Sequence, residues 1–150
     1  MKLEFMQAEF CDADTIIKMN KELIDKYEYT DKIDYNYVMY WVRKNVEENI
    51  KEYMRIVYEG QIAGFVYYHP SGNKMELDDL FLYPEFQNKG IGTAVIKKFI
   101  RETDKTIFLF VFIRNERAFS LYRRLGFKVT EKVHNSRYIM EREGEMVLCI

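Results

Sequence analysis

The sequence predicts an α/β (α+β) protein in which a mixed β-sheet is flanked by helices. The first ten residues read as a strand, two segments with hydrophobic residues at helical spacing follow, and the pattern then changes to short strand-like runs. From 75 to 113 the pattern is strand, loop, helix and strand, which predicts a right-handed crossover between two parallel strands. At 150 residues the chain can bury a core, so residues 1–150 are expected to form one domain.

The two segments with helical spacing are expected to form consecutive helices. Hydrophobic side chains recur every three to four residues over 11–29 and again over 34–50. Asp12 or Asp14 is available to cap the first helix, and Asp34 is placed to cap the second.

Strands and turns are expected to alternate after residue 53. Glu59-Gly60 is a hairpin signal between two strands within 54–69, and the segment HPSGN that follows reads as a turn. The apolar run 106–113 (TIFLFVFI) is typical of a strand buried on both faces of a parallel sheet. The remaining expected elements are strands over 74–84, 127–133, 137–143 and 146–150 and helices over 93–104 and 115–126.

Composition and charge exclude several classes of function. The chain has 23 Lys and Arg against 24 Asp and Glu, so neither nucleic acid nor an anionic membrane is expected as a partner. No apolar run is long enough to span a bilayer, and Cys11 and Cys149 have no metal or redox spacing, so a cytoplasmic protein is expected. His69 and His134 share no ligand spacing and are predicted to be surface residues, so no metal site is expected.

A glycine-rich loop, QNKGIG at 87–92, stands between a predicted strand and a predicted helix. Amide N–H groups at a helix N-terminus bind anions, and glycine lets the backbone approach a ligand closely. Two nucleotide-binding patterns do not fit, because the P-loop GxxxxGK[ST] is absent and GIGTAV lacks the third glycine of the Rossmann fingerprint. An ordinary turn uses the same residue types, so the loop alone leaves both interpretations open.

The loop has the form Q/R-x-x-G-x-G/A and resembles that of the GCN5-related N-acetyltransferases, the GNAT family. LDDLFLYPEFQNKGIGTAVI resembles the central strand, loop and helix of the family, and NERAFSLYRRLGFK resembles its second signature. The resemblance covers nearly the whole chain. It implies a GNAT-like mixed, mostly antiparallel, twisted sheet with a central splayed pair of parallel strands. It also implies acetyl-CoA as the acetyl donor.

The resemblance also implies how acetyl-CoA is bound. The loop is expected to wrap the pyrophosphate, and the preceding strand to pair with the peptide-like pantetheine arm. Gln87 is uncharged where many relatives have Arg, and the N–H of Leu80 is expected to face the thioester oxygen as charge develops. The implied cofactor-binding residues are Leu80, Phe81, Leu82, Gln87, Asn88, Lys89, Gly90, Ile91, Gly92, Thr93 and Asn115.

Candidate catalytic residues follow from the same resemblance. Tyr122 matches the general-acid tyrosine that protonates the departing thiolate of CoA, and two helical turns place it on the same face as Asn115. Core packing would explain Tyr122 otherwise, and helix capping would explain Asn115. For removal of the amine proton, Glu76 is the first choice and Asp78 the second; Asp79 lies on the same strand. Water could serve instead, and solubility or salt bridges would also explain these acids.

The expected function is transfer of an acetyl group from acetyl-CoA to a primary amine, by direct attack in a ternary complex. A catalytically silent acyl-CoA-binding module is the alternative, and a dinucleotide oxidoreductase is disfavoured by the missing glycine. The acceptor is a small-molecule or peptide amine, expected to be selected by residues 12–34 and the region after Phe127; a homodimer is one option for the assembly. The acids of the first region, which can attract a cationic amine or simply form a solvated face, are Asp25, Glu28, Asp31 and Asp34.

Overall fold

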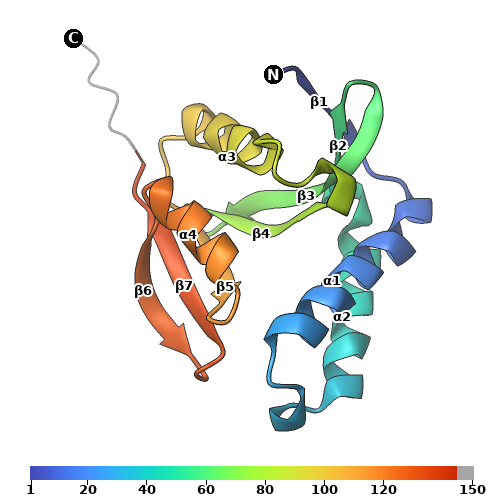
Figure 1. Ribbon diagram of the computed structural model, residues 1–150, viewed down its shortest axis with the longest axis vertical. Helices are drawn as coiled ribbons and strands as arrows, with labels where there is room; N and C mark the ends of the chain where they lie inside the picture. Colours follow the sequence, from blue (N-terminus) through green and yellow to red (C-terminus); the bar gives the residue numbers. More distant parts are fainter. Residues whose placement is uncertain (145–150) are drawn as a thin grey trace.

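The computed structural model describes residues 1–144 and shows a twisted, seven-stranded sheet with helices packed against it (Figure 1). The strand order is β1-β2-β3-β4-β5-β7-β6, and within the described residues β4 and β5 are the one parallel pair. The predicted mixed, mostly antiparallel sheet is therefore confirmed. The strands are β1 (Leu3–Gln7), β2 (Met54–Tyr58), β3 (Gln61–Ser71), β4 (Lys74–Leu82), β5 (Ile107–Phe112), β6 (Lys128–Val133) and β7 (Arg137–Arg142). The further strand expected over 146–150 lies outside the described residues.

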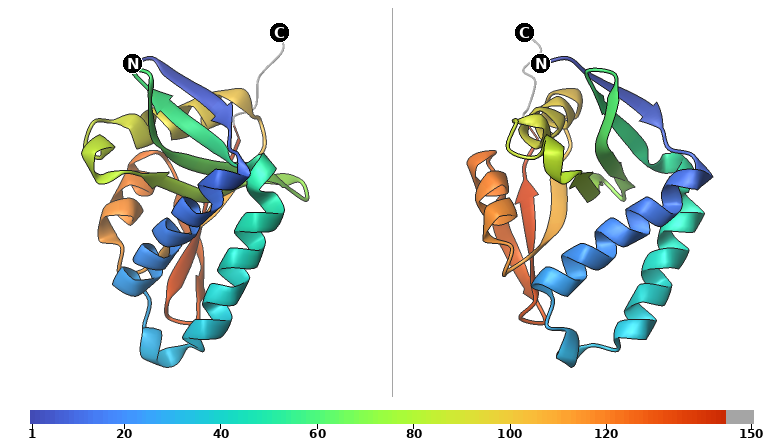
Figure 2. Two further views of the ribbon diagram at one scale, coloured as in Figure 1. Left: turned by 90° about the vertical axis from the view of Figure 1, so that its right-hand side faces the viewer. Right: turned by 45° about the vertical axis from the view of Figure 1, so that its right-hand side comes forward.

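Helices cover both faces of the sheet (Figure 2). They are α1 (Ala13–Tyr27), α2 (Tyr35–Asn49), α3 (Ile91–Glu102) and α4 (Glu116–Arg124). Successive side chains of a strand point to opposite faces, and β3 shows the result in its buried centre. Phe65 packs with Ile16 of α1 in one hydrophobic core, whereas Val66 packs with Val95 of α3 in the other. The sheet therefore separates an α1–α2 side from an α3–α4 side.

Two of the predicted helix caps form as expected. The Asp34 side chain accepts a hydrogen bond from the Tyr37 N–H at 3.1 Å, which caps α2. The Asn115 side chain accepts from the Ala118 N–H at 3.2 Å and caps α4. Each cap satisfies one of the amides that a first helical turn leaves without an intrahelical partner.

The predicted side-chain cap of α1 is wrong. A 3₁₀ turn (Phe10–Asp12) runs directly into α1, and Asp12 already has helical backbone angles, so its side chain makes no cap hydrogen bond to α1. The Asp12 carboxylate instead accepts from the Glu9 N–H and from Arg55 Nε, both at 2.8 Å. Asp14 pairs with Arg43 of α2 at 3.3 Å. These acids therefore tie the start of α1 to its neighbours.

The parallel pair is short and opens toward the carboxyl ends of its strands. Met75 lies opposite Ile107 and Glu76 lies opposite Phe108, and β4 and β5 pair at no later position. The ribbons of the two strands diverge from there (Figure 1). This is the splayed central pair that the sequence predicts.

The end of α1 is tied to loops at the far side of the splayed pair. Ser136 Oγ donates to the Glu28 carboxylate at 2.8 Å, and Arg114 Nη1 donates to the Glu28 carbonyl at 3.4 Å. The Tyr27 ring stacks on that of Phe112, with 6.5 Å between centroids. The two regions expected to select the acceptor therefore meet in space.

Among the described helices, none has both the length and the apolar character needed to cross a membrane. The expected cytoplasmic location stays a prediction.

Candidate active site

A β-bulge on the central strand decides which side chains face the α1–α2 side. Tyr67 of β3 lies opposite Asp79 and Tyr68 lies opposite Leu77, so Asp78 has no partner across the ladder. In such a bulge the extra residue interrupts the strict alternation of side chains. Leu77 packs into the core under α3, but Asp79 hydrogen-bonds to groups of the α1–α2 side. The bulge therefore sets Asp78 and Asp79 toward one side of the sheet.

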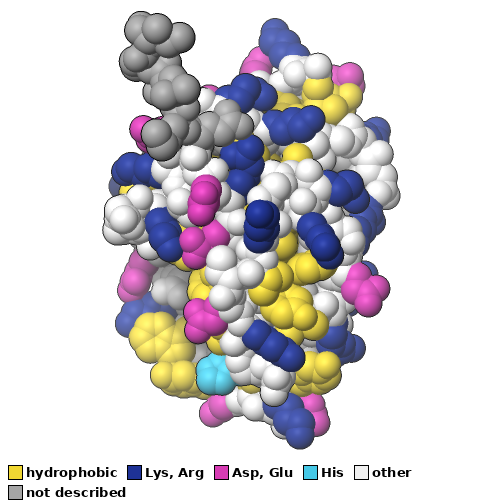
Figure 3. All heavy atoms as spheres, turned by 90° about the vertical axis from the view of Figure 1, so that its left-hand side faces the viewer, with side chains coloured by type: hydrophobic (Ala, Val, Ile, Leu, Met, Phe, Trp, Pro, Cys, Tyr) yellow, Lys and Arg dark blue, Asp and Glu magenta, His cyan; other side chains and the backbone are white. Residues whose placement is uncertain are grey.

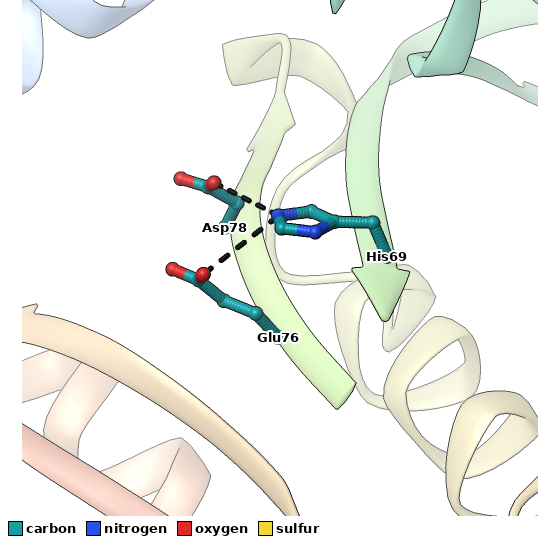
Figure 4. A group of neighbouring side chains, drawn as sticks. All are labelled: His69, Glu76 and Asp78. Carbon is teal, nitrogen blue, oxygen red and sulfur yellow. Dashed lines mark hydrogen bonds and ion pairs between the residues drawn. The ribbon is translucent and has the colours of Figure 1, made fainter. Parts of the chain in front are cut away.

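His69 joins the two acids that the sequence favours as bases (Figure 4). Its Nε2 lies 3.1 Å from Asp78 Oδ2 and 3.7 Å from Glu76 Oε1. The antiparallel register causes this contact, because His69 lies directly opposite Glu76. The ring also stacks on Tyr67, with 4.3 Å between centroids. His69, predicted to be a surface residue, is half-buried and paired with two carboxylates.

The three groups influence one another's protonation. Burial acts to lower the pKa of His69, but the Pro70 carbonyl and the charges of Asp78 and Glu76 outweigh it, so the pKa is raised. Burial, aided by the negative charge of Asp78, raises the pKa of Glu76. One ring nitrogen and two carboxylate oxygens lie within 4.8 Å of one another, so the charge of each group acts on the other two.

Asp79 is held more tightly than its two neighbours. The Tyr53 hydroxyl donates a short hydrogen bond to Asp79 Oδ2, and the Asn20 side chain of α1 is a second partner. The residue keeps some exposed surface, but its carboxyl group lies deep among protein atoms. Burial raises the pKa of Asp79 to about 7, and the hydrogen bonds from Tyr53 and Asn20 offset only part of that rise.

Tyr122 lies on α4 with its hydroxyl surrounded by protein. Its ring meets Phe127 edge-on, with 5.9 Å between centroids, and packs against the core of the α3–α4 side. Burial raises the pKa of Tyr122 to about 12, and the charge of Asp79 adds to the rise. The phenol is therefore protonated at neutral pH and close enough to Asp79 to be affected by its charge.

The glycine-rich loop has the backbone shape of an anion-binding turn. Asn88 and Gly90 have positive φ angles of 62° and 80°, and Gly90 directly precedes the first residue of α3. Left-handed backbone is readily adopted by glycine and tolerated by asparagine. The Gln87 side-chain amide donates to the Leu82 carbonyl at 3.1 Å, which ties the loop to the end of β4.

Amide groups at this helix start are available to a ligand. Within the part of the chain that the structure describes, the first loop or helix amide after Gln87 with a backbone acceptor is that of Ala94, which donates to the Gly90 carbonyl at 3.0 Å. The amides before it belong to the unpaired first turn, whose partial positive charge attracts anions. They are those of Asn88, Lys89, Gly90, Ile91, Gly92 and Thr93. The Lys89 side chain is exposed beside them.

The last residues of β4 have backbone N–H and C=O groups on the edge that β5 no longer covers. Leu80, Phe81 and Leu82 pair with β3 on one edge, but β5 pairs with β4 no further than Glu76. Their side chains pack into the cores, Leu80 and Leu82 on the α3–α4 side and Phe81 on the other. Any contact with a bound cofactor would therefore be made chiefly by backbone, as expected for a peptide-like arm.

The predicted residues are distributed along the central strand and the elements next to it. The loop follows β4, Tyr122 lies on α4, Glu76 is the last residue of β4 that pairs with β5, and Asp78 follows the paired stretch. Asn115 uses its side-chain oxygen for the helix cap, which leaves only its amide nitrogen for a ligand. Their roles toward acetyl-CoA and the acceptor stay predictions. Sequence reasoning missed Tyr53 and His69, because their contacts depend on strand register and a bulge that no local pattern shows.

Comparison with known proteins agrees with the fold and with the family that the sequence motifs resemble. The family model of the acetyltransferase (GNAT) family matches residues 16–127. The spermidine N(1)-acetyltransferase of Thermoplasma acidophilum is 30% identical, over 97% of this chain and 99% of its own. The spermine/spermidine N(1)-acetyltransferase of Bacillus subtilis is 30% identical, over 59% of this chain and 67% of its own.

Two solved structures share the fold. The PaiA N-acetyltransferase of Thermoplasma acidophilum, in complex with coenzyme A, has a TM-score of 0.69 at 23% identity, over 95% of this chain and 99% of its own. An N-acetyltransferase of Staphylococcus aureus has a TM-score of 0.69 at 14% identity, over 92% of this chain and 99% of its own. The chain thus belongs to the GNAT family and is an acetyl-CoA-dependent N-acetyltransferase.

Proposed function

We propose that the protein transfers an acetyl group from acetyl-CoA to a primary amine of a polyamine such as spermidine. Two of the relatives, which match over 97% and 59% of this chain, are named for spermidine or spermine. A polyamine carries several ammonium groups at neutral pH, since a free primary amine has a pKa near ~10. An acceptor site for it needs negative charge beside the place where the acetyl group is delivered.

The observation that carries this proposal is the group of acids on the α1–α2 side of the central strand. Glu76, Asp78 and Asp79 all lie there, next to the point where β4 and β5 separate. The stacked rings of Tyr53, Tyr67 and His69 lie alongside them, with 4.6 and 4.3 Å between successive centroids. Carboxylates and aromatic faces are the groups that attract ammonium ions.

The acids of the N-terminal helices suit this task less well than the sequence suggested. Asp25 accepts from Lys21 at 2.7 Å and from the Tyr35 hydroxyl at 2.6 Å. Glu28 accepts from Ser136, and Asp34 caps α2. These three carboxylates have partners in the protein, as Glu76, Asp78 and Asp79 also do. We assign recognition of the cationic acceptor to the central strand because its acids lie next to the point where β4 and β5 separate.

The proposed reaction uses the chain's own groups in four places. The amides from Asn88 to Thr93 hold the pyrophosphate, and the N–H of Leu80 stabilises negative charge on the carbonyl oxygen. Acetyl-CoA supplies the acetyl group, which the amine accepts by direct attack without an acyl-enzyme. Tyr122 gives a proton to the departing sulfur. Glu76 and Asp78 bind the cationic acceptor, and each also stays a candidate for taking its proton.

A panel of acceptors tests the proposed substrate class. The purified protein is given acetyl-CoA with spermidine, spermine, putrescine, an aminoglycoside and a peptide with a free α-amine, and CoA release is measured. We expect kcat/KM to be highest for spermidine or spermine. Preference for the peptide would reject the polyamine assignment.

A double substitution tests whether the two acids bind the acceptor. Glu76→Gln with Asp78→Asn should raise KM for spermidine by about tenfold or more, because an ion pair is lost, while KM for acetyl-CoA stays unchanged. An unchanged spermidine KM would remove these acids from the acceptor site. Binding of acetyl-CoA with no acetylation of any amine would instead favour the silent binding module.

A further inference from the structure

The carboxyl group of Asp79 is a buried titratable group that no motif assigns to the reaction. The Tyr53 hydroxyl donates to its Oδ2, and the Asn20 side chain of α1 helps to lower the pKa of Asp79. Tyr53 itself is only 3% exposed, and its ring packs against Tyr67 with 4.6 Å between centroids. The orientation of the Asp79 carboxyl is therefore set by rigid, buried neighbours rather than by solvent.

Its position in the sheet is next to Leu80, whose N–H is expected to face the thioester oxygen. Asp79 lies three residues beyond Glu76, the last residue of β4 that pairs with β5, and directly before Leu80. The bulge at Asp78 turns it to the α1–α2 side, where the acceptor is proposed to enter. Its charge also acts on Tyr122, whose pKa it helps to raise.

We propose that the Asp79 carboxylate takes the proton that the ammonium group of the acceptor must lose, and that Tyr53 positions this carboxylate. The assignment rests on the proposed amine acetylation. Asp79 thereby replaces Glu76 as the proposed proton acceptor. Glu76 and Asp78, which both pair with His69, then bind the positive charge of the acceptor. Asp78 is exposed to solvent, whereas the Asp79 carboxyl is shielded from it.

The protons balance in the following way. One proton passes from the ammonium nitrogen to Asp79, and the neutral nitrogen then forms its bond to the acetyl carbon. As the carbon–sulfur bond breaks, Tyr122 gives its hydroxyl proton to sulfur. The nitrogen then loses a second proton, which restores the Tyr122 hydroxyl through solvent. Asp79 releases its proton to solvent, so each turnover releases one proton.

The protonation of Asp79 suits this task near neutral pH. The titratable groups that face it are Tyr53, Tyr67, Glu76, Asp78 and Tyr122. The acids among them add negative charge, which acts with burial to keep the pKa of Asp79 at about 7. A proton acceptor works best when its pKa lies near the working pH. The rate should therefore fall as pH drops below about 7, because Asp79 becomes protonated.

The kinetic test compares pH profiles of kcat/KM for the best amine found in the acceptor panel, whatever its class. Asp79→Asn keeps the shape of the side chain and should lower kcat by ~10²–10⁴-fold with loss of the acidic limb. Glu76→Gln, Asp78→Asn and His69→Gln should each keep that limb, although KM for the amine changes. A wild-type profile in Asp79→Asn, or loss of the limb in Glu76→Gln alone, would overturn the proposal.

Tyr53→Phe tests the positioning role. The hydrogen bond from Tyr53 lowers the pKa of Asp79, so its removal should raise that pKa and move the acidic limb to higher pH. Melting temperature and CoA affinity, measured alongside, show whether each variant is folded. An acidic limb at the wild-type pH in a folded Tyr53→Phe variant would exclude the positioning role.

A direct titration needs no turnover. Carboxyl carbon NMR of the CoA-free protein identifies the Asp79 resonance as the one that is absent in Asp79→Asn. This resonance should titrate near pH 7, and its midpoint should move to higher pH in Tyr53→Phe. A midpoint near pH 4 for this same resonance would overturn the proposal. The acceptor class is tested separately, because Asp79→Asn can lose activity with any amine even if polyamines prove to be poor acceptors.

Discussion

At the scale of single residues, the proposed reaction depends on two buried groups with opposite protonation. Burial raises the pKa of Asp79 to about 7 and that of Tyr122 to about 12. Desolvation disfavours the charged form of both, but the reference values of a carboxyl and a phenol differ by several units. At neutral pH Asp79 can therefore accept a proton while Tyr122 can donate one. Burial thus adjusts the pKa values of both the proposed acid, Tyr122, and the proposed base, Asp79.

Tyr122→Phe tests the acid at this scale. The change keeps the ring that packs on Phe127 but removes the hydroxyl. Loss of a general acid should lower kcat by ~10²–10⁴-fold, while CoA affinity and melting temperature change little. Tyr138→Phe is the matched control, since Tyr138 packs against Phe119 in the same core and should keep its activity. Full turnover by Tyr122→Phe would leave Tyr122 as a packing residue.

At the scale of elements, the two glycines at the start of α3 serve different purposes. Gly90 is needed for its backbone conformation, and Gly92 for the space that it leaves. Gly90 has a φ of 80°, so any other residue there is strained whatever space surrounds it. Gly92 lies inside α3, where an added Cβ would come no closer than 3.9 Å to Leu82 Cδ1, an ordinary contact. The fold therefore requires Gly90, whereas Gly92 can change without a clash.

Substitution of these two glycines should separate stability from cofactor binding. Gly90→Ala should destabilise the protein by about 1–2 kcal/mol through left-handed strain. Gly92→Val should lower the melting temperature much less but weaken CoA binding by at least about tenfold, because its side chain occupies the face that the pyrophosphate approaches. Calorimetric titration with CoA and thermal unfolding measure both effects. Wild-type CoA affinity in a folded Gly92→Val protein would take the loop out of the site.

At the scale of the whole molecule, one face of the protein is rich in basic side chains. The face over α4 and β6, opposite to α1 and α2, carries many Lys and Arg side chains around an apolar area (Figure 3). A hollow of about 500 Å³ on it is lined in part by Arg123 and Lys128. The acids of the central strand face the α1–α2 side instead. A formal net charge of −1 therefore hides local concentrations of basic and acidic side chains.

The buried acid should also make global stability depend on pH. The pKa of Asp79 is about 7 in the folded protein and 3.8 in its ordinary state, so between these values the folded state binds more protons than the unfolded one. The free energy of unfolding must then fall as pH rises from 4 to 7. The wild type should lose on the order of 3 kcal/mol relative to Asp79→Asn over this range. His69 acts in the same direction, so the difference between the two proteins isolates Asp79.

Urea unfolding of both proteins at several pH values measures this difference. A constant difference from pH 4 to 7 would show that Asp79 ionises normally in the folded protein.

Most local features of the fold follow from the sequence alone. Hydrophobic spacing predicted the four long helices, and Asp34 and Asn115 cap two of them as expected. Local patterns succeed here because a cap or a helical face depends on residues within one or two turns. The GNAT motifs extended this to the splayed central pair, which the structure confirms.

The environment of the acids was decided only by the tertiary structure. Strict alternation places Asp79 opposite in direction to Asp78, but a bulge at Asp78 brings both to one side. Tyr53, which is 26 positions away in the chain, then reaches the Asp79 carboxyl, and the strand register sets His69 against Glu76. Sequence showed that acids stand on the central strand, but register and burial, which arise from long-range pairing and packing, determine which of them is desolvated.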